Sequence, residues 1–192
     1  MKNIAIFASG EGTNAQNIIN YFKNDAQVKV ALVVCNKPQA NVLKRAQEAA
    51  IPTFLINRNN FIDSDEAVNV LKNAKIDLIV LAGFLWLIPT NLIKVYPNEI
   101  INIHPALLPK YGGKGMYGMN VHKAVIANQE NESGISIHYV NENYDEGKII
   151  DQYKCKVTAA DSVATLALKI HELEQQFFPI IIEKILKSKS EG

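Results

Sequence analysis

The sequence predicts an α/β protein built on a doubly wound, mostly parallel sheet, with an antiparallel extension near the C-terminal half. Over the first hundred residues, short apolar runs alternate with longer amphipathic runs, and this alternation is typical of strand–helix–strand units. The apolar runs are uninterrupted, as in Leu78–Ala82, which suits strands buried on both faces of a parallel sheet. Two later strand-like runs have only a short connection between them, so we expect them to pair as a hairpin.

The elements of the first hundred residues follow in order along the chain. Five runs have the length and the β-branched composition of strands: Ile4–Ala8, Val28–Cys35, Thr53–Ile56, Leu78–Ala82 and Ile100–His104. Between these runs, three amphipathic segments predict helices: Asn14–Phe22, Val42–Ala50 and Asp63–Asn73. We therefore expect right-handed strand–helix–strand units in this half of the chain.

The second half of the chain is less regular. Gly112–Met119 contains four glycines in eight residues, and this composition predicts a mobile loop rather than a helix or a strand. Ile135–Val140 and Ile149–Val157 predict the two hairpin strands, which are joined through Asn141–Lys148. The hairpin would give the parallel sheet its antiparallel extension.

One long helix is predicted near the end of the chain. Asp161 or Ser162 can cap its N-terminus, and apolar residues then recur at helical spacing to about Leu186. Pro179 lies inside this stretch and is expected to kink the helix. Because the chain has no repeat, low-complexity segment or linker, we expect a single domain over residues 1–192.

The composition argues against several classes of function. The formal net charge is only +1, so no general field attracts nucleic acid or an anionic membrane. No apolar stretch approaches the roughly 20 residues that span a bilayer, and we expect a cytoplasmic protein without a membrane partner. Cys35 and Cys155 lie far apart and suit two buried thiols. No group of residues has the spacing of a zinc motif, so we expect no metal.

A glycine-rich turn, Ser9–Asn14, follows the first predicted strand and opens the first predicted helix. Glycines let the backbone approach a ligand, and free N–H groups at a helix N-terminus favour phosphate. The turn lacks the lysine of a Walker loop, and Ala15 stands where a dinucleotide fingerprint has its third glycine. It therefore suits a monophosphate better than a pyrophosphate, although an ordinary tight turn capped by Thr13 or Asn14 explains it equally well.

The segment Ile101–Pro105 ends the fifth predicted strand. Ligands bind at the carboxyl ends of strands in open α/β sheets, and strand alternation places Asn102 and His104 on the same side. An amide and an imidazole that point together into a crevice could polarise a carbonyl and hold a developing oxyanion. The alternative is a histidine that hydrogen-bonds to backbone at a strand end.

A carboxylate, Asp145, lies in the connection between the hairpin strands. Such a residue is often only part of a turn, but if it faced His104 it would favour the imidazolium and could accept a proton. The remaining histidines have less to suggest a function. His138 alternates within a strand and is predicted to be structural or to support a residue of the site, whereas His122 and His171 are predicted to be packed or solvated residues on helix faces.

Four segments, taken together, resemble the phosphoribosylglycinamide formyltransferases. Residues 102–111 read NIHPALLPKY and resemble the family signature N-I-H-P-[SA]-L-L-P. Residues 134–147 read GISIHYVNENYDEG and resemble the second signature of the folate-formyl group. Ser9–Asn14 is similar to the family's phosphate loop and Leu81–Phe84 to its folate-pocket strand. The segments follow the family order and cover nearly the whole chain, so the resemblance implies the Rossmann-like formyltransferase fold.

The resemblance also implies roles for individual residues. The catalytic residues would be Asn102, His104 and Asp145. The substrate phosphate would be held by Gly12, Thr13 and Asn14, and the ribose hydroxyls of the substrate by Glu174. The folate pocket would be lined by Leu85, Trp86, Leu87, Ile88 and Asn102 and by the segment Asn141, Glu142, Asn143, Tyr144 and Asp145. Residues 1–100 would form the phosphate- or nucleotide-binding half, and residues 101–192 the catalytic and folate-binding half.

The implied reaction moves a formyl group from 10-formyltetrahydrofolate to the amine of 5-phosphoribosylglycinamide in de novo purine biosynthesis. The partners would be these two small molecules, and the protein would act as a monomer or a homodimer. The amine would attack the formyl carbon directly. Protonated His104, kept charged by Asp145, and the Asn102 amide would stabilise the oxyanion while a proton passes through water to the departing folate nitrogen.

Two positions depart from the family pattern. Many relatives carry a basic residue that meets the folate glutamate near the position of Asp65, which is acidic here, and Arg58 is the nearest substitute. The Gly112–Met119 segment is also longer than in familiar members of the family, so its role over the site is not implied by the resemblance.

Three rival functions remain to be compared. Methionyl-tRNA formyltransferase shares the catalytic domain but adds a tRNA-binding domain, for which 192 near-neutral residues leave no room. Formyl-folate hydrolase adds an amino-terminal regulatory domain, whereas here the first predicted strand starts almost at once. A non-catalytic nucleotide-binding module would use only the Gly10–Asn14 loop and would not need Asn102, His104 and Asp145 to converge.

Overall fold

The computed structural model describes residues 1–188, and the chain divides into two compact units, Met1–Ile101 and Asn102–Gly192. The strand order is β3-β2-β1-β4-β5-β6-β7, and the division falls inside β5 (Ile100–His104). The predicted α/β class is confirmed: the sheet is mostly parallel and ends in an antiparallel pair. The prediction that the chain is one domain stays a prediction.

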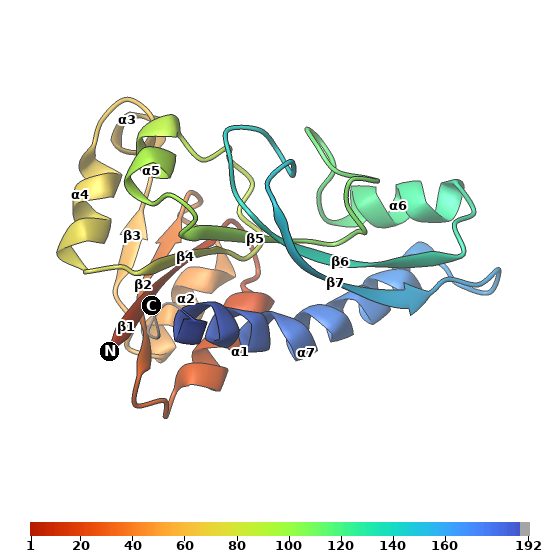
Figure 1. Cartoon of the computed structure of the whole chain (residues 1–192), viewed down its shortest axis with the longest axis horizontal. Coiled ribbons are helices and arrows are strands. Elements are labelled where there is room, and N and C mark those ends of the chain that lie inside the picture. Colours follow the sequence, from red (N-terminus) through yellow and green to blue (C-terminus); the bar gives the residue numbers. More distant parts are fainter. Residues whose placement is uncertain (189–192) are drawn as a thin grey trace. The chain divides into compact units, whose positions relative to one another are not determined.

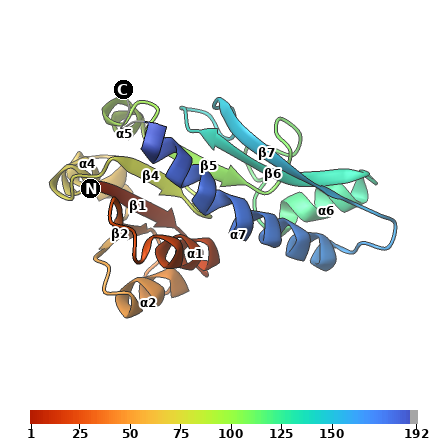
Figure 2. The ribbon, with the colours of Figure 1, turned by 60° about the horizontal axis from the view of Figure 1, so that its bottom comes forward.

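The first unit is a parallel sheet with helices on its faces (Figure 1). Its strands are β1 (Lys2–Ala8), β2 (Val28–Cys35), β3 (Thr53–Leu55) and β4 (Leu78–Leu81). Its helices are α1 (Thr13–Phe22), α2 (Asn41–Glu48), α3 (Arg58–Phe61), α4 (Glu66–Asn73) and α5 (Thr90–Val95). Figure 2 shows α1 and α2 together on one side of β1 and β2, with α4 and α5 on the other side. Residues 4–7 are fully buried, which explains why β1 reads as an uninterrupted apolar run.

The sequence missed the two shortest helices of this unit. Helix α3 has four residues and begins with a reciprocal cap, in which the Asn57 side chain accepts from the Asn60 amide and the Asn60 side chain accepts from the Asn57 amide. Residues up to Asp65 therefore lie outside the helix that was predicted from Asp63, and α4 starts at Glu66. Helix α5 has six residues and follows Pro89. Elements this short carry too few residues to show a helical period.

The second unit contains β6 (Glu132–Tyr139) and β7 (Ile149–Lys156), α6 (Met119–Ala127) and α7 (Val163–Ser188). β6 and β7 pair in antiparallel fashion, which confirms the predicted hairpin. Helix α7 packs against both hairpin strands and against α6, and Figure 2 shows it running along them. The Ser162 hydroxyl accepts a hydrogen bond from the Thr165 amide at 3.2 Å, so one of the two predicted caps is confirmed. The helix continues as one element with Pro179 inside it.

The hairpin is closed by a glycine that no other residue could replace without rearrangement. A Cβ atom on Gly147 would lie 1.7 Å from the carbonyl oxygen of Tyr139. The two strands can therefore approach closely just beyond Asp145, and this approach fixes where the connection begins and ends. Among residues 1–188, no helix is both long enough and apolar enough to cross a membrane.

Candidate active site

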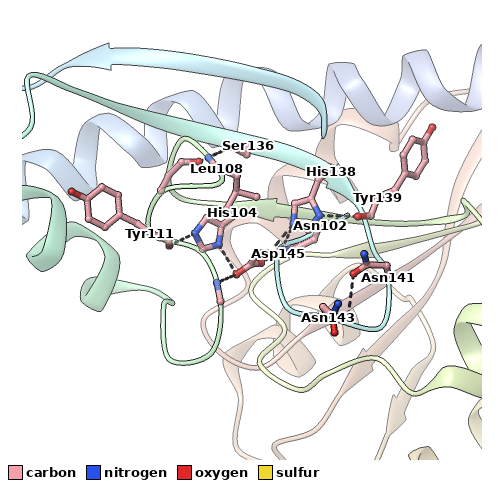
Figure 3. A network of polar contacts seen from close by, with 12 residues as sticks. Asn102, His104, Leu108, Tyr111, Ser136, His138, Tyr139, Asn141, Asn143 and Asp145 are labelled. Carbon is pink, nitrogen blue, oxygen red and sulfur yellow. Dashed lines mark hydrogen bonds and ion pairs between the residues drawn. The ribbon is translucent and has the colours of Figure 1, made fainter. Parts of the chain in front are cut away.

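Asp145 brings together the residues that the sequence singled out at the end of β5. Its Oδ1 accepts a hydrogen bond from Asn102 Nδ2 at 3.4 Å, and its Oδ2 lies 3.5 Å from His104 Nδ1. Figure 3 shows the three side chains meeting, with Asp145 reaching in from the β6–β7 connection. All three belong to the second unit, so one carboxylate organises an amide and an imidazole from the same strand end.

The backbone around Asp145 holds its carboxylate in place. Asp145 has φ 58°, a left-handed conformation that is uncommon for a residue other than glycine. The Gly113 amide donates to Oδ2 at 2.9 Å. Burial raises the pKa of Asp145, but its interactions with His138, His104 and the Gly113 amide outweigh burial and leave that pKa below its ordinary value. Asp145 is therefore an anion at neutral pH.

His104 is buried, and both of its ring nitrogens face acceptors. Nε2 donates to the carbonyl oxygen of Tyr111 at 2.8 Å, which leaves the Nδ1 lone pair of the neutral ring toward Asp145. Burial lowers the pKa of His104, and neither the Asp145 charge nor the Tyr111 carbonyl fully compensates. The charge of Asp145 therefore favours the imidazolium, whereas burial is the larger effect and favours the neutral imidazole. The expectation that His104 acts in its protonated form stays a prediction. A proton added at Nδ1 would face Asp145 directly.

His138, which the sequence predicted to be structural or to support a residue of the site, is a member of this cluster. Its Nδ1 donates to the carbonyl oxygen of Tyr139 at 2.8 Å, so in the neutral ring Nε2 accepts from Asn102 Nδ2 at 3.1 Å. Both amide hydrogens of Asn102 thus have acceptors, His138 and Asp145. The opposite amide orientation would place the Asn102 oxygen against a carboxylate, so the amide oxygen is the atom left to accept from a ligand. A register shift between Ile137 and His138 marks this strand position, but no periodicity in the sequence reveals it.

The segment after β5 is tied to the hairpin by one buried hydroxyl. Ser136 Oγ donates to the Ala106 carbonyl oxygen at 2.7 Å and accepts from the Leu108 amide at 2.9 Å. Gln152 Nε2 donates to the same hydroxyl at 2.8 Å and to the Leu108 carbonyl oxygen at 3.0 Å. These bonds fix the backbone at Ala106 and Leu108, shortly after His104.

A cavity of about 370 Å³ lies beside Asp145 in the second unit. It is lined by Leu108, Pro109, Gly112, Gly113, Tyr144, Asp145, Glu146, Gly147 and Ile149. Most of these residues belong to the glycine-rich segment or to the hairpin connection. Within that connection, Asn141 Oδ1 accepts from the Asn143 amide at 3.0 Å, and Asn143 Nδ2 donates to Glu146 at 2.8 Å. Glu142 and Tyr144 are exposed. The connection therefore has a defined shape of its own.

Glu174, the residue expected at the substrate ribose, lies on α7 in the second unit. Its Oε2 is 3.5 Å from His171 Nδ1, and the hydrogen bond with Glu174 raises the pKa of His171. The charge of Glu174 also acts on His104 and on His122, raising the pKa of each against the larger effect of burial. The negative charge of Glu174 thus favours the protonated form of His104 and of His122.

The expected phosphate loop lies in the first unit and has the geometry of an anion site. Gly12 has φ 71° and precedes α1, whose start no side chain caps. A Cβ atom on Gly12 would lie 2.7 Å from the Val42 side chain. Helix α2 holds the loop, because the Val42 amide donates to the Gly10 carbonyl and Arg45 Nε donates to the Glu11 carbonyl. The turn at Gly12 thus leads directly into the N-terminus of α1, where helix amides favour an anion.

The expected folate segment, Leu85–Ile88, also lies in the first unit. The Leu85 amide donates to Ser9 Oγ at 3.0 Å, which links this segment to the glycine loop. Leu85 and Leu87 are 38% and 39% exposed and could contact a ligand, whereas Ile88 is only 2% exposed and belongs to the core. Trp86 lies in an aromatic cluster with Phe61 and Phe84, and the Arg58 guanidinium lies 5.7 Å from its ring centroid.

Comparison with known proteins gives one consistent result. The family model described as formyl transferase matches residues 2–182. The phosphoribosylglycinamide formyltransferase of Haemophilus influenzae is 37% identical over 188 residues, which are 95% of this chain and 86% of that protein. The enzyme of the same name from Bacillus subtilis is 34% identical over 197 residues, which are 100% of this chain and 98% of that protein. A chloroplastic relative from Arabidopsis thaliana is 38% identical, and 69% of its length is covered.

Solved structures agree with the sequence relatives. The phosphoribosylglycinamide formyltransferase from Bacillus halodurans has a TM-score of 0.86 at 35% identity, and the match covers 96% of this chain and 95% of that chain. The glycinamide ribonucleotide transformylase 1 from Geobacillus kaustophilus has a TM-score of 0.88 at 34% identity, with 97% and 99% covered. These similarities extend over nearly the full length of both chains.

Proposed function

The chain belongs to the formyl transferase family, and from this premise we propose that it transfers a formyl group from 10-formyltetrahydrofolate to the amine of 5-phosphoribosylglycinamide, a step of purine biosynthesis. The observation that carries the proposal is the contact of one ionised carboxylate, Asp145, with both Asn102 and His104 at a strand end. The bacterial relatives that align over nearly their whole length are named for this activity.

The chemistry follows from the geometry of the Asp145 cluster. When the amine attacks the formyl carbon, the formyl oxygen gains negative charge, and a positive imidazole nearby stabilises that charge. In the free protein burial favours neutral His104, so developing negative charge in the site promotes proton uptake at His104 Nδ1. Asp145, which lies 3.5 Å from that nitrogen, then stabilises the imidazolium. Proton uptake and oxyanion formation are thereby coupled.

For Asn102 we propose a contact with the attacking amine, in place of the oxyanion contact expected from the sequence. Its amide hydrogens are held by His138 and Asp145, so its amide oxygen accepts a hydrogen bond from the attacking amine and orients the lone pair toward the formyl carbon. The amine loses one proton during the reaction, and the departing folate nitrogen gains one through water. No nucleophilic side chain is needed, because the acyl acceptor is the substrate amine itself.

The remaining assignments place the two substrates. The amides of Thr13 and Asn14 bind the substrate phosphate, and Gly12 gives the loop its left-handed turn. The Glu174 carboxylate accepts hydrogen bonds from the ribose hydroxyls. The exposed side chains of Leu85 and Leu87 and the backbone of Asn141–Asp145 hold the folate.

A direct assay tests this function. Purified protein is mixed with 10-formyltetrahydrofolate, with and without phosphoribosylglycinamide, and both folate deformylation and formylated product are followed. We expect deformylation only when the amine acceptor is present, and we expect the Asp145→Asn variant to lose it. Deformylation that is independent of the acceptor would instead indicate a hydrolase, and formylation of methionyl-tRNA in place of phosphoribosylglycinamide would indicate a tRNA-directed enzyme.

A further inference from the structure

The turn Tyr111–Gly113 contacts both His104 and Asp145 through its backbone (Figure 3). The Tyr111 carbonyl oxygen accepts a hydrogen bond from His104 Nε2 at 2.8 Å. At the other end of the turn, the Gly113 amide donates to Asp145 Oδ2 at 2.9 Å. The groups that fix this turn therefore also position the imidazole and the carboxylate of the candidate active site.

The backbone of Tyr111 has a conformation that its surroundings must hold. Its φ is 57°, in the left-handed region that residues other than glycine rarely adopt. The side chain supplies an anchor, because the Tyr111 hydroxyl donates to Glu130 Oε1 at 2.8 Å. Lys110, the preceding residue, donates to both oxygens of the same carboxylate, at 2.9 Å and 3.2 Å. Glu130 lies between α6 and β6, so it ties the turn to a segment beyond helix α6.

Glu130 holds the turn through two contacts of unequal weight. The hydrogen bonds from Lys110 and Tyr111 lower the pKa of Glu130, so its carboxylate is an anion at neutral pH. The Lys110 side chain is 66% exposed, and an ion pair of that kind contributes little because water screens it. The Glu130 side chain is only 23% exposed, so the Tyr111 hydroxyl meets a carboxylate that is partly shielded from solvent. We therefore expect the bond from Tyr111 to hold the turn more strongly than the bond from Lys110.

The position of the Tyr111 carbonyl decides which nitrogen of neutral His104 carries the proton. Because Nε2 donates to that carbonyl, the lone pair lies at Nδ1, 3.5 Å from Asp145 Oδ2. A second proton then enters at Nδ1, and the resulting imidazolium has an acceptor at each nitrogen. Without the carbonyl, the single proton of the neutral ring would shift to Nδ1, toward the carboxylate. The site for proton uptake beside Asp145 would then be lost.

We infer that Glu130 is a positioning residue for His104, because it holds the Tyr111 carbonyl at Nε2 through the Tyr111 hydroxyl. The inference rests on the proposed function, in which His104 stabilises the oxyanion. The protonation of the ring can nevertheless be measured without a substrate. The position of the proton and its use in the reaction can therefore be tested separately.

Nitrogen-15 NMR of the histidine rings tests the position of the proton. The spectra are recorded at about pH 8, above the ordinary pKa of histidine, and His104→Gln identifies the signals of that ring. In the wild type the proton should be on Nε2. Glu130→Ala and Tyr111→Phe should both populate the form with the proton on Nδ1, and both should lower the pKa of His104, which the Tyr111 carbonyl raises. Glu130→Gln keeps an oxygen that accepts from the Tyr111 hydroxyl, so it should keep the wild-type form.

Steady-state kinetics test the use of this positioning in the reaction. Glu130→Ala should lower kcat for formyl transfer by about tenfold, the effect expected for one hydrogen bond to a charged group. KM should change little for either substrate, because the contact orients a reacting group rather than a ligand. Tyr111→Phe should lower kcat to a similar extent, and the double variant should be no worse than either single variant, since all three break one contact. Glu130→Gln should recover most of the turnover.

A matched control is a second glutamate–lysine pair close by in the same unit. Glu132 Oε1 lies 2.9 Å from Lys154 Nζ, the same separation as between Glu130 and Lys110. Glu132→Ala removes this ion pair and should leave kcat, both KM values and the protonation of His104 unchanged. Circular dichroism and thermal unfolding establish that each variant is folded. If Glu130→Ala fails to fold, Tyr111→Phe decides, because it removes a single oxygen atom.

The results that would overturn the inference are specific. A proton on Nδ1 in the neutral wild type, or the wild-type form in folded Glu130→Ala and Tyr111→Phe, would reject the positioning of His104. An unchanged kcat in these variants, or an equal loss in Glu132→Ala, would reject its use in the reaction. If the wild type does not formylate phosphoribosylglycinamide while the variants shift the proton, the proposed function fails and the positioning stands. If the wild type is active and the proton does not shift, the inference alone fails.

Discussion

Each unit has a strand end that carries candidate functional residues, and the two strand ends are built in different ways. The end of β1 leads into Gly10–Asn14, where backbone conformation and the start of α1 supply the binding groups. The end of β5 supplies Asn102 and His104, whose side chains are held by Asp145 and by His138. A site built from backbone groups depends on the conformation of one glycine. A site built from side chains depends on every residue of its hydrogen-bond network. Substitutions should therefore affect binding at the first strand end and turnover at the second.

The largest effect is expected in the Asp145 cluster. His104→Ala or Asp145→Asn should lower kcat by about 10²–10⁴-fold, because each removes charge stabilisation of the reacting oxygen. The double variant should be little worse than either single variant, since the two residues act as a unit. Steady-state kinetics measure this, and binding of a folate analogue should stay mostly intact. Near-normal turnover in either single variant would mean that the cluster is not the catalytic centre.

The residues at the strand ends were predicted from the sequence better than the residues that hold them in place. The alternation of Asn102 with His104, and the glycine turn before the first helix, are local patterns that appear directly in the order of residues. The approach of Asp145 was implied only by the resemblance, because it depends on how the β6–β7 hairpin closes. His138 and the partner of its Nε2 could not be predicted, since their contact joins residues 36 positions apart. No periodicity encodes such a pair.

The same limit explains the helices without predicted bounds and the open choice between a packed and a solvated His122. Helix α6 begins at Met119, the last residue of the glycine-rich segment, so the sequence placed His122 on a helix face without giving the bounds of that helix. His122 was judged from its place on a helix face, and its burial depends on packing against α7. The strands of the first unit were predicted well because burial on both faces requires an uninterrupted apolar run. Such a run can be recognised in the sequence without knowing which residues pack against the strand.

The second effect in size compares two glycines of one loop. Gly12→Ala should destabilise the protein by about 1–3 kcal/mol, because Gly12 has a positive φ and its Cβ would meet Val42 at 2.7 Å. It should also raise KM for phosphoribosylglycinamide. Gly10→Ala is the matched control, since a Cβ atom at Gly10 meets nothing within 4 Å. Urea unfolding measures both, and equal stability of the two variants would show that the loop tolerates a side chain at either glycine.

Acid should destabilise the buried histidines next. The folded pKa values of His104 and His122 are lowered, chiefly by burial, so below the unfolded pKa of about 6.5 the unfolded chain binds protons that the folded protein does not. Stability is complete above that pH and falls below it, by up to about 1.4 kcal/mol per pH unit for each histidine. The raised pKa of His171 acts in the opposite direction. Urea unfolding between pH 7.5 and 5.5 should show a net loss that is shallower in His104→Gln. A slope as steep in that variant would assign the loss to other groups.

The smallest effect concerns a side-chain contact in the first unit. The comparison of the two strand ends would predict that this unit binds its ligand through backbone groups alone. Asp65, which stands where many relatives carry a basic residue, accepts a hydrogen bond from Asn91 at 2.8 Å and cannot bind a carboxylate. Arg58 is an exposed cation against Trp86, beside the proposed folate segment.

Arg58→Gln should therefore weaken binding of a folate with its glutamate by about three- to tenfold, the range expected for an exposed ion pair with a cation–π contribution. Binding of an analogue without the glutamate should be unaffected, and the difference between the ligands should shrink at high salt. Trp86 is the single tryptophan of the chain, so its fluorescence reports both titrations. Lys44→Gln removes another exposed cation of the same unit and should change neither. Equal losses for the two ligands would mean that Arg58 supports Trp86 rather than the glutamate, and recognition in this unit would then need no charged side chain.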